Sequence, residues 1–156
     1  MVLQILEQFA LLVKKTNLRP RRNQNVLMVK HIMIEDVVTA KPNTTIKEVI
    51  RVLHEKHVGS VVITDYNRKC VGIFTEQDAI RIVANEVPLD TTIDQVMTKN
   101  VITIGEEASL EEARRILMSH RIRHIPAVDH KGELTGLLSV RKLLEQLFGL
   151  DTTKYY

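Results

Sequence analysis

The chain has 156 residues, of which 44% are hydrophobic and 26% charged, with a formal net charge of +3 and a single cysteine, Cys70. This length can bury the core of one ordinary domain, and a lone cysteine excludes an internal disulfide. No apolar run approaches the roughly 18 residues of a membrane span, and the N-terminus lacks a signal-peptide pattern. We therefore expect a cytoplasmic globular protein, whose mild positive charge favours anionic ligands without requiring nucleic acid.

Residues 1–28 come before the regular part of the chain. An amphipathic helix ending near Lys14 and Lys15 is predicted there from apolar residues at helical spacing, namely Val2, Ile5, Leu6, Phe9, Leu12 and Val13. A basic linker, Arg19 to Arg22, follows. We expect the helix to pack on the module or on a second subunit; docking to a membrane surface or an acidic partner is the alternative. A third interpretation takes Met28 as the true start.

The next segment alternates between strand and helix patterns. Val37 to Thr39 is typical of a short strand, and Thr45 with Glu48 three residues later is a capping box that starts a helix. Two strands are predicted over 60–64 and 70–74, joined by a polar turn, and Thr75 begins a second helix. The predicted order is strand, helix, strand, strand, helix, which is typical of an α/β fold.

The same order returns at an offset of roughly 64 residues, without gaps. Met33 aligns with Met97 and Gly72 with Gly136. We predict two copies, over 29–85 and 86–148, and a C-terminal tail over 149–156. Because each copy leaves one apolar face open, the two should pack on each other about a pseudo-twofold axis.

The segment Gly72 to Asp78, with sequence GIFTEQD, resembles the G-hydrophobic-x-S/T-x-x-D signature of the CBS (cystathionine-beta-synthase type) motif. Arg123 to Asp129 and the Ile-Met and Val-Met pairs at the two copy starts fit the same family. Two tandem copies resemble a Bateman module. The resemblance implies a cleft on each side of the shared sheet and an adenosine-containing nucleotide as its occupant.

One good ligand site is expected around Thr75 and Asp78. They start a helix, where free N–H groups and the helix dipole favour an anion, and Asp78 offers acceptors for ribose hydroxyls. The alternative role of the pair is helix capping. The resemblance implies that the second copy supplies the opposing wall, with Ile102 and Thr103 beside the adenine and Arg123 and His124 toward the phosphates. Arg141 is a further phosphate candidate, and Ile125 and Pro126 belong to the same site. For Arg123 and His124 the alternative is a solvated basic strand edge.

A second, weaker site is expected because Lys142 stands at the position equivalent to Asp78, and lysine has no acceptor for ribose hydroxyls. Its predicted residues are Val38, Thr39, Gly59, Ser60, Ser139 and Lys142. Lys142 could hold a phosphate there instead.

Motifs of common catalytic and metal sites are absent from the sequence, and we expect no enzymatic activity, no metal and no required cofactor. The expected function is regulatory: binding AMP, ADP or ATP, with S-adenosylmethionine and NAD ranked behind, and signalling to an unidentified protein partner as a homodimer. The alternative is a nucleic-acid-binding protein that uses its basic N-terminal segment, with the CBS pair as a dimerisation scaffold.

Overall fold

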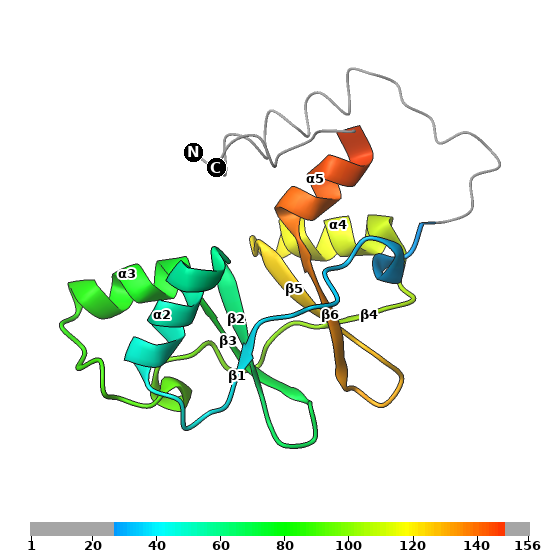
Figure 1. Ribbon diagram of the computed structural model, residues 1–156. Helices are drawn as coiled ribbons and strands as arrows, with labels where there is room; N and C mark the ends of the chain where they lie inside the picture. The colour runs from blue at the N-terminus through cyan, green and yellow to red at the C-terminus, as the bar shows by residue number, and fades with distance from the viewer. Residues whose placement is uncertain (1–26, 149–156) are drawn as a thin grey trace.

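The computed structural model describes residues 27–148 (Figure 1). The predicted N-terminal helix, the basic linker and the C-terminal tail lie outside these residues. The first copy contains β1 (Thr39–Ala40), α2 (Ile46–Lys56), β2 (Ser60–Thr64), β3 (Cys70–Thr75) and α3 (Glu76–Ala84). The second contains β4 (Ile104–Gly105), α4 (Leu110–Ser119), β5 (His124–Val128), β6 (Leu134–Ser139) and α5 (Val140–Phe148). Short 3-10 turns, η1 (Val29–His31) and η2 (Ile93–Gln95), come before each copy's first strand.

Each copy forms a three-stranded mixed sheet, which confirms the predicted element order. β1 runs parallel to β2, and β2 runs antiparallel to β3; β4, β5 and β6 repeat this arrangement. Both ladders shift register near the hairpin, between Ile63 and Thr64 and between Ala127 and Val128. The two hairpins point in the same direction, with the helices toward the other end of the molecule (Figure 1).

The first strand of each copy begins later than the sequence predicted. The strand expected over 37–39 is β1, at Thr39–Ala40. Its counterpart in the second copy, expected at an offset of 64 over 101–103, is β4, at Ile104–Gly105. Thr98 is still bonded to Ile73 of the first sheet, at N···O distances of 3.0 and 3.1 Å. Residues 99–103 must therefore cross between the sheets before β4 can pair with β5.

Each helix of the first copy starts with a complete capping box. The Thr45 N–H donates to Glu48 Oε2 at 2.9 Å, and the Glu48 N–H donates back to Thr45 Oγ1 at 3.3 Å. The Thr75–Asp78 pair at the start of α3 has the same geometry. Such a cap contributes about 1 kcal/mol because it satisfies N–H groups that have no partner within the helix.

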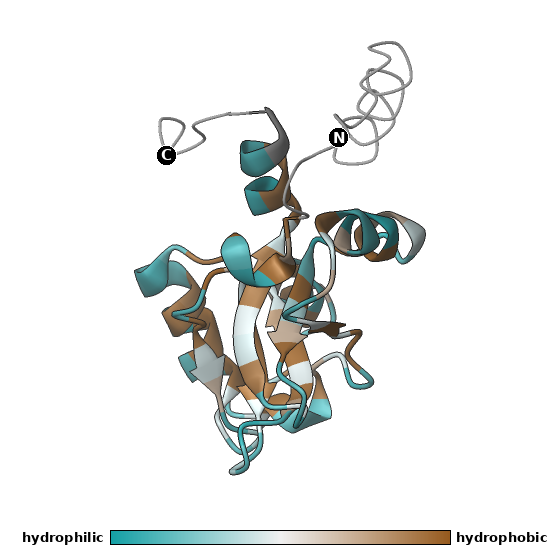
Figure 2. Ribbon diagram, turned by 90° about the vertical axis from the view of Figure 1, so that its right-hand side faces the viewer, coloured by the Kyte–Doolittle hydropathy of each residue, from teal (hydrophilic) through white to brown (hydrophobic). Residues whose placement is uncertain are grey.

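Each of the two hydrophobic cores contains residues from the start of the other copy, an exchange of leading segments between the copies. The core under α2 and α3 contains Ile93, which comes from the start of the second copy. The core under α4 and α5 contains Val29 and Ile32, from the start of the first copy. Burial of a side chain of this size contributes about 1.5–3 kcal/mol, so neither core is complete without the other copy. Figure 2 shows hydrophobic residues along the strands and hydrophilic residues on the outward sides of the helices.

Candidate functional site

The two copies meet where β2 and β5 begin. A Cβ placed on Gly59 would lie 3.4 Å from His124 Nε2 and 3.6 Å from Glu76 Oε2. Ser60 pairs with Thr75, and His124 pairs with Ser139 at the equivalent place in the second sheet. Thus strand starts and helix starts of both copies gather at one end of the sheets. This juncture is the candidate site.

Asp78 is held firmly at the start of α3, with its side chain 15% exposed. Its Oδ2 accepts from the Thr75 N–H and the Thr75 hydroxyl, both at 2.9 Å. Its Oδ1 accepts from Arg81 at 2.8 Å, and Arg81 also donates to the Val96 carbonyl at 3.0 Å. Because a carboxylate has about four acceptor positions, these three bonds leave room for one further donor. The predicted cap is therefore formed, and the ribose role stays a prediction.

The second copy carries the opposite charges at the same two positions. Lys142 replaces Asp78 and Glu145 replaces Arg81; Lys142 Nζ lies 3.5 Å from Glu145 Oε2. Arg141 Nε also lies 3.3 Å from Glu145. The Lys142 N–H donates to Ser139 Oγ at 3.1 Å, so the hydroxyl cap is retained while the returning carboxylate is lost. The two pseudo-equivalent helix starts thus have the same backbone and inverted side-chain charge.

Electrostatics keep His124 neutral at physiological pH. Burial and, to a smaller extent, the Arg123 guanidinium lower the pKa of His124 to about 4. A neutral imidazole donates through one nitrogen and accepts through the other. His124 can therefore hydrogen-bond a ligand but adds no positive charge, which leaves Arg123 as the cation of this strand start.

Ser60 has a buried hydroxyl without a partner. The residue is 3% exposed, and its Oγ makes no hydrogen bond within the part of the chain that the structure describes. Leaving such a group unsatisfied costs about 1–3 kcal/mol. Its place at the start of β2, next to Gly59 and opposite Thr75, means that this unused donor lies at the juncture of the two copies.

The other predicted site residues differ in their burial and in their distance from the juncture. Ile102 is half-buried and Thr103 exposed, both in the segment that crosses between the sheets. Ile125 and Pro126 are both buried; Ile125 lies in the second core, and Pro126, the next residue of β5, faces the other side of the sheet. Val38 packs on the first core.

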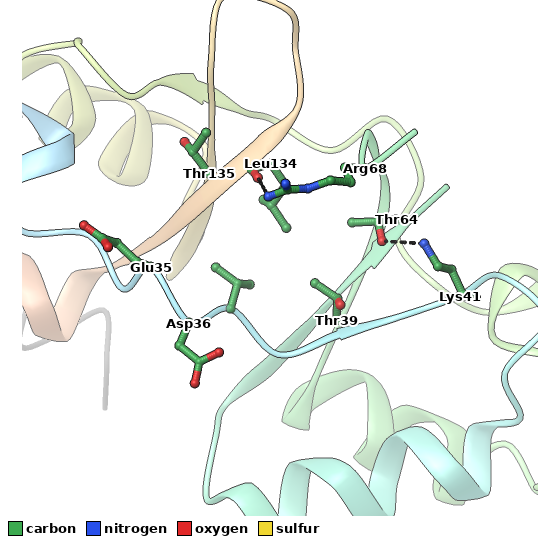
Figure 3. Close-up of a pocket in the computed structure, with 9 residues that line it drawn as sticks. Glu35, Asp36, Thr39, Lys41, Thr64, Arg68, Leu134 and Thr135 are labelled. Carbon is green, nitrogen blue, oxygen red and sulfur yellow. Dashed lines mark hydrogen bonds between the residues drawn. The ribbon is translucent and has the colours of Figure 1, made fainter. Parts of the chain in front are cut away.

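Thr39 lies away from the juncture. It lines a cavity of about 260 Å³ at the hairpin end, which the sequence did not predict (Figure 3). The cavity is also lined by residues of both copies, namely Glu35, Asp36, Val37, Lys41, Thr64, Arg68, Leu134 and Thr135. The signal that could have revealed it is the replacement of Lys41, Thr64 and Arg68 by Gly105, Val128 and Gly132 at the equivalent positions of the second copy.

No helix within residues 27–148 combines the length and apolar character that crossing a membrane requires. The same residues contain no group of three or more His, Cys, Asp and Glu side chains placed to hold a metal ion.

The sequence of this chain matches a known protein family and several of its members. The CBS domain model matches twice, over residues 29–85 and 93–149. The chain belongs to the CBS domain family. Its CBS pair is similar to an uncharacterised 17.7 kDa protein of Acidianus ambivalens, with 32% identity over 81% of this chain and 77% of that protein. It is also 35% identical to inosine-5'-monophosphate dehydrogenase of Nitrosopumilus maritimus over 76% of this chain. The match spans only 24% of that dehydrogenase.

Solved CBS pairs share the fold over nearly their whole length. The CBS domain protein of Pyrobaculum aerophilum complexed with AMP has a TM-score of 0.72 and 26% identity, covering 80% of this chain and 100% of that one. The CBS domain pair of protein MJ0100, in complex with 5-methylthioadenosine and S-adenosyl-L-methionine, has a TM-score of 0.72 and 28% identity. It covers 80% of this chain and 97% of the other.

Proposed function

We propose that this CBS pair is a regulatory module that binds an adenosine-containing nucleotide, AMP, ADP or ATP, between its two motifs. The observation that carries the proposal is the likeness to the Pyrobaculum aerophilum protein complexed with AMP, which extends over that whole chain. The MJ0100 pair, whose two ligands also carry an adenosyl group, supports the same class. S-Adenosylmethionine ranks behind because it has no phosphate, whereas Arg123 and Arg141 are suited to phosphates. NAD also ranks behind the three adenine nucleotides.

Asp78 takes the ribose in this proposal. The carboxylate has one acceptor position to spare, and a ribose hydroxyl can gain a second bond by displacing Arg81, whose pairing at an exposed site contributes little. Ile102 and Thr103 flank the adenine. Arg123 and neutral His124 face the phosphates. Ile125 and Pro126 hold that strand start in place.

The second site, built from Val38, Gly59, Ser60, Ser139 and Lys142, is proposed to be weaker. Thr39, which the sequence also assigned to it, lies at the hairpin end and is left out. Lys142 already lies 3.5 Å from Glu145 and offers donors only. An adenosine nucleotide would therefore lose its ribose contact there and keep only phosphate contacts. We expect one strong site in each chain.

In this proposal the module regulates its partner through the relative arrangement of its two copies, which are coupled because each core contains residues from the start of the other copy. A nucleotide at the juncture touches both copies, so it favours whichever relative arrangement of the copies binds it better. A partner protein would sense that arrangement. Ile80 and Val83 on α3 are 68% and 71% exposed, which suits the proposed homodimer. No chemistry on the nucleotide is proposed.

Titration calorimetry with AMP, ADP, ATP, NAD and S-adenosylmethionine tests the proposal on the full chain. We expect one of the three adenine nucleotides to bind most tightly, at a stoichiometry near one, and to be recovered unchanged after prolonged incubation. Absence of binding by every adenosyl compound would contradict the adenosine assignment, and release of a reaction product would contradict the absence of chemistry.

A further inference from the structure

The cavity of about 260 Å³ at the hairpin end, here called the hairpin pocket, is separate from the juncture where the helices start. Both copies build it. Thr39, Lys41, Thr64 and Arg68 come from the first copy, and Leu134 and Thr135 from the second. The two hairpins are tied together beside it, since the Leu134 N–H donates to the Arg68 carbonyl at 2.9 Å.

Two cations on one wall of the hairpin pocket have only neutral partners. Lys41 Nζ donates to the Asp65 carbonyl at 2.7 Å and to Thr64 Oγ1 at 3.3 Å. Arg68 donates to the Leu134 carbonyl at 3.3 Å. Neither forms an ion pair with a carboxylate from residues 27–148. Their positive charges are therefore not neutralised within the described structure.

The two acidic residues of the rim do not compensate these charges. Glu35 and Asp36 line the opposite side, and Figure 3 shows both carboxylates pointing away from Lys41 and Arg68. Glu35, Asp36 and Arg68 are exposed, so water screens all three charges, whereas Lys41 is half-buried. The interior between the two sides is lined by Val37 and by hydroxyl-bearing threonines.

The repeat provides an internal comparison. At the positions equivalent to Lys41 and Arg68, the second copy has Gly105 and Gly132. Where the first copy has Thr64, the second has Val128; where the second has Thr135, the first has Val71. Since both copies form the same sheet and hairpin, the fold does not require these polar side chains.

The backbone conformation at Arg68 also indicates that the fold does not require an arginine there. Its φ is 62°, in the left-handed region, and the equivalent Gly132 has a φ of 78°. Glycine adopts this conformation freely, whereas a side chain there costs about 1 kcal/mol. The first hairpin keeps an arginine at this position despite that cost.

We propose that the hairpin pocket binds a small oxyanion, a phosphate or a carboxylate, between Lys41 and Arg68. Arg68 presents a planar fork of donors and Lys41 a compact charge, and both groups suit such an anion. The hydroxyls of Thr39 and Thr64 add donors from the side. The site is independent of the proposed nucleotide cleft and gives the module a second input.

Calorimetric titration of the full chain with inorganic phosphate, and separately with succinate, tests this site. We expect one of the two probes to bind once per chain, with affinity at least tenfold weaker in both Arg68→Gly and Lys41→Gln. Arg68→Gly copies the residue of the second hairpin, and circular dichroism verifies that each variant folds. Lys131→Gln removes one positive charge from the second hairpin as the matched control and should bind like the wild type.

Two results would overturn the proposal. One is failure of both anions to bind. The other is equal binding by the wild type, Arg68→Gly and Lys41→Gln, which would place the anion elsewhere, for instance in the nucleotide cleft. Neither result bears on adenosine binding, which is measured separately.

Discussion

Met97, from the start of the second copy, lies directly against Gly72 in β3 of the first. A Cβ on Gly72 would overlap Met97 Sδ and lie 2.9 Å from Met97 Cγ. Met33 occupies the same place over Gly136 in the second sheet, with Cγ at 2.6 Å from the equivalent point. Gly72 and Gly136 thus each leave room for a methionine from the start of the other copy. Both glycines therefore take part in the packing between the two motifs.

Gly72→Ala should therefore destabilise the fold. The added methyl group forces Met97 to move in a packed region, and overpacking of this kind costs about 1–3 kcal/mol. Urea unfolding measures the change. Gly105→Ala is the control, because a Cβ there would meet nothing within 4 Å, and its free energy of unfolding should change by less than about 0.5 kcal/mol. Equal effects of the two substitutions would contradict the close contact.

Ile93→Ala should lower the free energy of unfolding by about 2–5 kcal/mol, since Ile93 is fully buried in the first core. Ile80→Ala, on the exposed side of α3, should have a small effect in the monomer. Chemical denaturation of both variants makes the comparison. If Ile93→Ala were as mild as Ile80→Ala, the exchange of leading segments between the cores would be wrong.

Acid should weaken the fold through His124. Its folded pKa is about 4, below its ordinary value of 6.5, so the unfolded chain binds more protons between these pH values. Stability from this group is complete above pH 6.5 and decreases as pH falls toward 4, by at most about 3 kcal/mol. Urea unfolding at pH 7.5 and pH 5 should show a smaller difference in His124→Gln than in the wild type. The exposed His130→Gln should behave like the wild type, and an unchanged difference in His124→Gln would contradict the pKa assignment.

Cys70 should react slowly with thiol reagents while the protein is folded. Burial raises the pKa of its thiol to about 11, so little thiolate exists at neutral pH. Labelling with iodoacetamide at pH 7.5 should be much slower in the native protein than in urea. Comparable rates in the two conditions would mean that the thiol is not buried and that its pKa is not raised.

Local patterns in the sequence predicted much of the fold. The offset between Gly72 and Gly136 gave two copies, and the Thr45 and Thr75 caps marked helix starts, because capping depends on residues three apart. Ile93 was beyond such reasoning, since an apolar residue at a copy start can enter either core. The pocket around Lys41 and Arg68 was missed because it forms only when two hairpins distant in sequence meet. The expectation of one strong and one weak site depended on Lys142 alone. The structure adds that Lys142 lies beside Glu145, so the charges of the Asp78–Arg81 pair are reversed in the second copy.

Recognition of adenosine through Asp78 can be tested by comparing the AMP affinities of the wild type, Asp78→Ala and Glu48→Ala. Asp78→Ala removes both the proposed ribose contact and a capping box, whereas Glu48→Ala removes the equivalent box from α2 alone. Calorimetry should show AMP binding weakened at least tenfold, about 1.4 kcal/mol, in Asp78→Ala and unchanged in Glu48→Ala. AMP that binds Asp78→Ala as tightly as the wild type, or that does not bind the wild type, would contradict the claim.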